Sequence, residues 1–218
     1  MSNERAEKQS KKTPLRIRGD ERFGWLDRTI SKEAMDCLWK NIDNKKSNAG
    51  DFLAGNISAS YFIPDKDNWF FENVLKECTL EYYYKDWISY YNVHVVKNTL
   101  PPEFELNQFW VNYQKQHEFN PPHVHKECIY SFVVFMKIPT HWKEQHNVIT
   151  SSDGVGCASD FQFIVNGSLS PITYEIELSS EDEARILFFP GYLMHQVFPF
   201  YGTEEDRITV SGNITFKN

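Results

Sequence analysis

The chain has 218 residues, a formal net charge of −7 and an aromatic content of 16%. This length is enough for one domain with a hydrophobic core, and the aromatic content favours a β-rich body. No apolar run approaches the roughly 18 residues that a membrane helix needs, and the charged first residues lack the apolar stretch of a signal peptide. We therefore expect a cytoplasmic protein without membrane contacts.

Charge is distributed unevenly along the chain. Residues 1–18 hold six Lys and Arg against two Glu, so this arm carries +4 and the remaining 200 residues carry −11. An acidic body is a poor surface for nucleic acid, although the basic arm could contact phosphate weakly. We expect residues 1–13 to be a disordered arm and residues 14–218 to form a single domain.

Two helices are predicted in the first half of the chain, as helical support over about residues 30–91. Ser31 is a candidate N-cap for an amphipathic helix that reaches about Asp43, with Ala34 at the position where a capping box would need Glu or Gln. A second apolar helical pattern runs from about Asn68 to Tyr91.

After Pro101 and Pro102 the pattern changes to short segments of period two, separated by Pro, Gly, Asn and Ser. These segments cover about residues 104–113, 128–138, 157–165, 171–178, 184–189, 193–199 and 206–216. Such a series is typical of an antiparallel sandwich or jelly roll. The fold class is therefore mainly β with helical support: a β core over about residues 104–216, preceded by two helices. The segment 128–138 is apolar on both faces, as in a central strand covered on both sides, with the helices on one of them.

The last predicted strand separates polar from apolar side chains. Arg207, Thr209, Ser211 and Asn213 fall on one face, and the residues between them fall on the other. Four polar residues in register indicate either a solvent face or the wall of a polar cavity.

Two histidines form an HxH motif just after two prolines. Alternation places His123 and His125 on the same side of an extended segment, a spacing that can present two imidazoles to one metal. A third, His195, lies near the start of a strand, where a jelly roll could bring it beside the pair. Arg207 follows it by twelve residues and can form two parallel hydrogen bonds to a carboxylate, with Thr209 or Ser211 completing the contact.

The order of these motifs resembles the Fe(II)- and 2-oxoglutarate-dependent oxygenases of the double-stranded β-helix fold. More narrowly, the chain is similar to oxygenases, many of them phage-encoded, that are related to prolyl hydroxylases. If the gene is viral, the expected cytoplasmic location would be the cytoplasm of the host. The resemblance covers about residues 104–216 and includes the approach from Trp110 to Gln114 followed by Asn120 to His123. It implies that His123 and His195 bind Fe(II). It also implies that Arg207 holds the distal carboxylate of 2-oxoglutarate.

The same resemblance assigns supporting roles around the cosubstrate. Thr209 and Ser211 would assist Arg207, and Tyr113 or Asn112 would reach 2-oxoglutarate from the facing strand. It also exposes a departure, because the usual triad contains two His and one carboxylate, and this chain has His125 where the carboxylate would stand.

Three interpretations of this departure compete. His125 could coordinate the metal, giving a three-His site. Alternatively His125 and Glu127 could act with His195, leaving His123 outside, or only two histidines could bind, with water or another anion in the third place. We favour the three-His site, because His123 follows the Pro-Pro turn as the first ligand does in the family.

The expected activity is a dioxygenase reaction in which 2-oxoglutarate and O₂ are consumed, succinate and CO₂ are released, and a substrate is hydroxylated. A protein, a peptide or a small molecule are the candidate substrates, since fold alone does not select one. Two alternatives remain: a non-catalytic cupin-like module that binds a metal or ligand, and a zinc hydrolase, for which three His and a water are a known ligand set. Arg207 distinguishes the oxygenase from both alternatives, because neither of them needs a residue dedicated to binding a carboxylate at this position.

Overall fold

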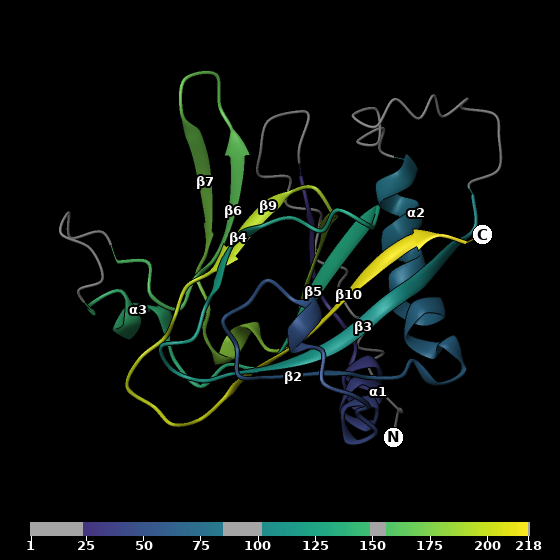
Figure 1. Cartoon of the computed structure of the whole chain (residues 1–218), viewed down its shortest axis with the longest axis horizontal. Helices are drawn as coiled ribbons and strands as arrows, with labels where there is room; N and C mark the ends of the chain where they lie inside the picture. The colour runs from purple at the N-terminus through teal and green to yellow at the C-terminus, as the bar shows by residue number, and fades with distance from the viewer. Residues whose placement is uncertain (1–23, 85–101, 149–155, 218) are drawn as a thin grey trace, which may run out of the picture.

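The computed structural model describes residues 24–84, 102–148 and 156–217. The predicted basic arm and the last part of the second predicted helix lie outside these residues. Ten strands of the described part form two antiparallel sheets, with strand orders β1-β8-β5-β10-β3-β2 and β4-β9-β6-β7 (Figure 1). The architecture is the expected jelly roll of the double-stranded β-helix type.

The strand bounds follow the predicted segments closely. They are β1 Leu26–Thr29, β2 Ala59–Phe62, β3 Phe104–Gln114, β4 Asn120–His123, β5 Tyr130–Lys137, β6 Phe161–Asn166, β7 Pro171–Ile176, β8 Arg185–Pro190, β9 Met194–Val197 and β10 Arg207–Phe216. The seven predicted segments correspond to β3 and β5 to β10. The strands β1, β2 and β4 are not among the predicted segments, although the residues around His123 on β4 were expected to be extended.

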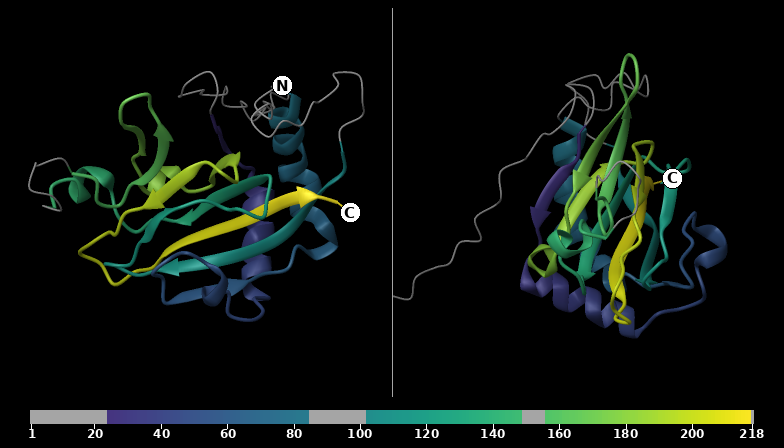
Figure 2. Two further views of the ribbon diagram at one scale, coloured as in Figure 1. Left: turned by 45° about the horizontal axis from the view of Figure 1, so that its top comes forward. Right: turned by 90° about the vertical axis from the view of Figure 1, so that its left-hand side faces the viewer.

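The two predicted helices lie on one face of the six-stranded sheet (Figure 2). Helix α1 spans Lys32–Asp43, and the Ser31 hydroxyl accepts a hydrogen bond from the Ala34 backbone N–H, which confirms the predicted cap. Helix α2 spans Lys76–Tyr84 and continues a π-helical turn over Phe71–Leu75. The helical segment starts at Trp69, which agrees with the predicted start at about Asn68, and Asp67 and Asn68 before it have left-handed backbone angles.

Shorter helical turns complete the described secondary structure. They are 3-10 turns at Gly50–Phe52, Lys66–Asn68 and Ser180–Asp182, and α3 at Trp142–Gln145. None of the helices in the described residues has the length and apolar character needed to cross a membrane.

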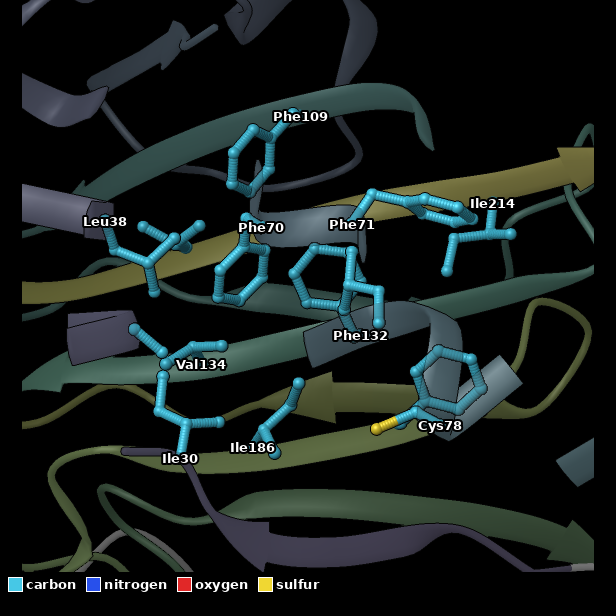
Figure 3. Packing of buried hydrophobic residues seen from close by; sticks show 14 of the residues in the cluster. Ile30, Leu38, Phe70, Phe71, Cys78, Phe109, Phe132, Val134, Ile186 and Ile214 are labelled. Atoms are coloured by element: carbon cyan, nitrogen blue, oxygen red, sulfur yellow. The ribbon is translucent and has the colours of Figure 1, made fainter. Parts of the chain in front are cut away.

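The central strand β5 contributes to two hydrophobic cores. Phe132 and Val134 pack toward the helices, together with Phe70 (Figure 3). Val133 and Phe135 point the other way, into the core between the two sheets. Alternation along one strand therefore serves both layers, as the apolar pattern of residues 128–138 predicted.

Candidate metal centre and cosubstrate cavity

A cavity of about 400 Å³ opens among the strands of both sheets. Its walls come from β3, β4, β9 and β10, and from residues 50–57 beside β2. All four polar residues of β10, from Arg207 to Asn213, line it. Val210 and Ile214, on the other face of the strand, belong to the core under the helices. The polar face of the last strand is therefore the wall of a cavity and not a solvent face.

Three histidines meet at one place in this wall. His123 on β4 and His195 on β9 are direct partners across the strand ladder, and their ring centroids are 4.2 Å apart. The backbone N–H of His125 donates to the Gly191 carbonyl at 2.7 Å, which fixes the segment after β4 against the turn before β9. One ligand nitrogen from each ring lies within 4.8 Å of the other two.

Backbone carbonyls orient two of the three rings. Nδ1 of His123 lies 2.8 Å from the Pro121 carbonyl, and Nδ1 of His195 lies 2.8 Å from the Leu193 carbonyl. A carbonyl only accepts, so Nδ1 must carry the proton in both rings. Nε2 is then left unprotonated, which is the form that binds a metal.

Burial keeps all three imidazoles neutral. It lowers the pKa of His125 to about 4, with a further contribution from His123. The pKa values of His123 and His195 are lowered for the same reason, and the latter ring is also surrounded by Phe161 and Phe189. Near pH 7 the cluster therefore offers uncharged nitrogen donors, the ligand type that suits iron, zinc and related transition metals.

Arg207 lies buried in the same cavity, with 1% of its surface exposed. Its Nη2 donates to the Ser159 carbonyl at 2.9 Å and to the Ser159 hydroxyl, while Nε and Nη1 have no hydrogen-bond partner among the described residues. Burial lowers its pKa to about 10, so the guanidinium remains charged at neutral pH. Two unpaired donors of a buried cation fit one carboxylate of a ligand.

A buried carboxylate balances part of this charge. Asp160 is fully buried, its electrostatic field acts on Arg207, and both its oxygens lie 2.9 Å from Nε2 of His146. Burial raises the pKa of Asp160 to about 6, against the opposing hydrogen bond with His146. Sequence patterns did not single out Ser159, Asp160 or His146, because no motif connects them with Arg207.

The other predicted site residues divide into two groups. Asn112, Thr209 and Ser211 line the cavity, and Asn112 accepts a hydrogen bond of 2.7 Å from the Ser60 hydroxyl. Tyr113 lies on the opposite face of β3 and packs against Tyr61, since adjacent residues of a strand point to opposite sides. Of the two residues predicted to reach the cosubstrate from this strand, only Asn112 is in a position to do so.

Glu127, the alternative ligand, also borders the cavity, but its side chain is exposed and lies outside the three-histidine cluster. Trp110 also belongs to the site. It is buried, yet it lines the cavity and stacks on His125 with ring centroids 6.0 Å apart.

Comparisons with known proteins agree with this geometry. Residues 108–213 match the family model described as "Putative 2OG-Fe(II) oxygenase". No curated protein matches the chain.

Among solved structures, a prolyl-4-hydroxylase from Pseudomonas putida is similar with a TM-score of 0.54 at 10% identity, over 90% of this chain and 94% of that one. HygX from Streptomyces hygroscopicus, solved with nickel, 2-oxoglutarate and hygromycin B, gives a TM-score of 0.49 at 8% identity, over 89% and 84% of the two chains. The likeness to the prolyl-4-hydroxylase supports the fold. The residues matched by the family model include all three histidines of the cluster and Arg207. Residues 108–213, a little under half of the chain, are therefore similar to the 2OG-Fe(II) oxygenase family.

Proposed function

We propose that the protein is a dioxygenase that binds one Fe(II) through His123, His125 and His195 and hydroxylates a protein, peptide or small molecule. 2-Oxoglutarate is the cosubstrate. The observation that carries the proposal is the pair of Arg207 donors that have no partner among the described residues, buried in the same cavity as three neutral imidazoles. A metal site alone has no use for a buried cation with two free donors.

The charges in the cavity support a dianionic cosubstrate. Three neutral histidines leave both charges of Fe(II) uncompensated, while Asp160 offsets the charge of Arg207. The two carboxylates of 2-oxoglutarate supply the missing negative charges, one beside the metal and one at Arg207. Histidine in place of a carboxylate ligand is therefore compatible with a neutral, buried complex.

Some residues of the cavity would bind the cosubstrate, and others would exclude water. Arg207, with Thr209 and Ser211 on the same strand face, would bind the far carboxylate and so orient the keto acid end toward the histidines. Bound Fe(II) would supply the redox chemistry that couples decarboxylation of 2-oxoglutarate to succinate and CO₂ with insertion of one oxygen atom of O₂ into the substrate. The phenylalanines around His195 restrict water at the reacting centre.

Optical spectroscopy under anaerobic conditions tests the proposal. Fe(II) and 2-oxoglutarate together should give the weak visible charge-transfer band of the chelate, and Arg207→Ala should abolish cosubstrate binding while metal binding persists. A zinc hydrolase would instead retain zinc tightly and show no such band. That result, with unchanged 2-oxoglutarate affinity in the Arg207 variant, would overturn the proposal.

A further inference from the structure

The three histidines differ in what holds their second ring nitrogen. His123 and His195 each pair Nδ1 with a backbone carbonyl two residues earlier. Among the described residues, no backbone carbonyl plays this part for His125. A neutral imidazole without such a partner can place its proton on either nitrogen, and a proton on the inner nitrogen would prevent coordination.

Asn213 lines the same cavity as His125. It belongs to the polar face of β10 and is 8% exposed. Its side chain interacts with the imidazole and favours the protonated ring, in opposition to burial. An oxygen that accepts from a ring N–H has this effect, since it stabilises the form with more ring protons.

The amide of Asn213 is itself held in one orientation. Its Nδ2 donates to Oε1 of Gln108 at 2.7 Å, and the two residues are register partners between β10 and β3. With the nitrogen engaged, Oδ1 is turned away from Gln108; it is buried and has no partner of standard hydrogen-bond geometry among the described residues. A buried acceptor without a partner costs free energy, and a donor on His125 would satisfy it.

The strand ladder is irregular beside Asn213. The β3–β10 register shifts between Asn213 and Ile214, and the extra residue lies on β3. Such irregularities are common next to functional sites. Trp110 stacks on the His125 ring, so an aromatic contact holds the imidazole plane.

We propose that Asn213 is a positioning residue for His125: its Oδ1 accepts the N–H of the imidazole and keeps the other ring nitrogen unprotonated and directed at the metal centre. The effect of this hydrogen bond on iron binding rests on the proposed function, whereas the hydrogen bond itself would also form in the metal-free protein. A carboxylate ligand needs no such partner, because it has no tautomers. The amide therefore complements the replacement of that carboxylate by histidine.

The metal-free protein provides the first test. Long-range ¹H–¹⁵N spectra of histidine-labelled protein should show one tautomer for His125 in the wild type and in Asn213→Asp, which keeps the acceptor. Asn213→Leu, of similar volume but without an acceptor, should show a mixture of tautomers, and Asn213→Ala serves the same purpose if the leucine variant does not fold. An unchanged tautomer in the variants without an acceptor overturns the proposal.

Metal affinity provides the second test, with Co(II) as a redox-stable probe. Loss of an outer partner of a ligating histidine should weaken binding about 10- to 100-fold in Asn213→Leu, whereas Asn213→Asp should bind at least as tightly as the wild type. Gln145→Leu is the matched control, because it removes a buried amide that bonds Tyr201 and does not line the cavity. Equal affinities in Asn213→Leu and Gln145→Leu would refute the positioning role.

The two tests separate this inference from the proposed function. If the wild type binds no Co(II) but the His125 tautomer depends on Asn213, the iron site fails and the positioning role stands. If the wild type binds Co(II) and the His125 tautomer does not depend on Asn213, the metal site stands and the positioning role of Asn213 fails.

Discussion

His123 and His195 face each other across the β4–β9 ladder although 72 residues separate them in the chain. The pairing of two four-residue strands therefore creates the centre of the site. His125 joins them through its backbone bond to Gly191, on the turn that leads into β9. The geometry of the cluster is thus a property of strand register and not of one loop.

Alanine substitution at each histidine tests the ligand set. We expect His123→Ala, His125→Ala and His195→Ala each to lower Fe(II) affinity by at least about 100-fold, more than the loss of an outer partner would. Glu127→Ala should leave affinity close to wild type, because this side chain is exposed and outside the cluster. Anaerobic titration with Fe(II) measures both. Equal, small losses in the His125 and Glu127 variants would contradict both assignments.

The buried charge of Asp160 gives a second prediction. Asp160→Asn leaves Arg207 without its counter-charge and should destabilise the protein by roughly 3 kcal/mol, the cost typical of an uncompensated buried charge. The same change leaves the charge of the guanidinium to a bound dianion alone, so 2-oxoglutarate with Fe(II) should raise the melting temperature more in the variant than in the wild type. Thermal unfolding under anaerobic conditions measures both effects.

A matched control exists at the β1 edge of the six-stranded sheet. Asp27 pairs with Arg185 at 2.6 Å, and neither residue lines the cavity. Asp27→Asn should lower the melting temperature as well, but the shift produced by 2-oxoglutarate should equal that of the wild type. A larger ligand shift in both variants would mean that general instability, not the charge at Arg207, is responsible.

Protonation of His125 should make its contribution to stability depend on pH. The unfolded chain protonates histidine near pH 6.5, whereas folded His125 resists until about pH 4. Its contribution is complete above pH 6.5 and is lost as the pH falls toward 4, by up to about 3 kcal/mol. Asp160 acts in the opposite direction, because its raised pKa of about 6 favours folding as the pH falls through the same range.

The comparison that isolates His125 is therefore with His125→Gln. Between pH 7 and pH 4 the free energy of unfolding of the metal-free wild type should fall by about 3 kcal/mol more than that of the variant. Urea unfolding at the two pH values measures the difference. Parallel changes in the two proteins would show that His125 titrates as it does in the unfolded chain.

Local alternation was enough to predict much of the site. It placed the four polar residues of β10 on one face, and the HxH spacing placed two histidines on one side of an extended segment. The partners of Arg207 could not be predicted, because Ser159 lies 48 residues away and holds the guanidinium from a left-handed backbone position. Tyr113 and Asn112 were indistinguishable until the register of β3 fixed which of them faces the cavity. Strand register, which the sequence pattern leaves open, decides such contacts.

The turn before β9 links the packing of the fold to the histidine cluster. A Cβ on Gly191 would lie 2.5 Å from Sγ of Cys128 and 2.9 Å from the carbonyl oxygens of Cys128 and His125. Gly191→Ala must therefore push the His125 backbone away from β9, and we expect both a loss of stability of about 1 to 3 kcal/mol and a weaker Co(II) site.

Gly167→Ala is the control for this last prediction. Its Cβ would meet the Ser170 carbonyl oxygen at 2.4 Å, in the turn between β6 and β7, whose residues do not line the cavity. Both variants should unfold at lower urea concentrations than the wild type, but only Gly191→Ala should lose Co(II) affinity. If Gly167→Ala weakened the metal site equally, the effect would come from general overpacking. A loss of Co(II) affinity in Gly191→Ala alone would show that the contact between the His125 backbone and this turn determines the position of His125.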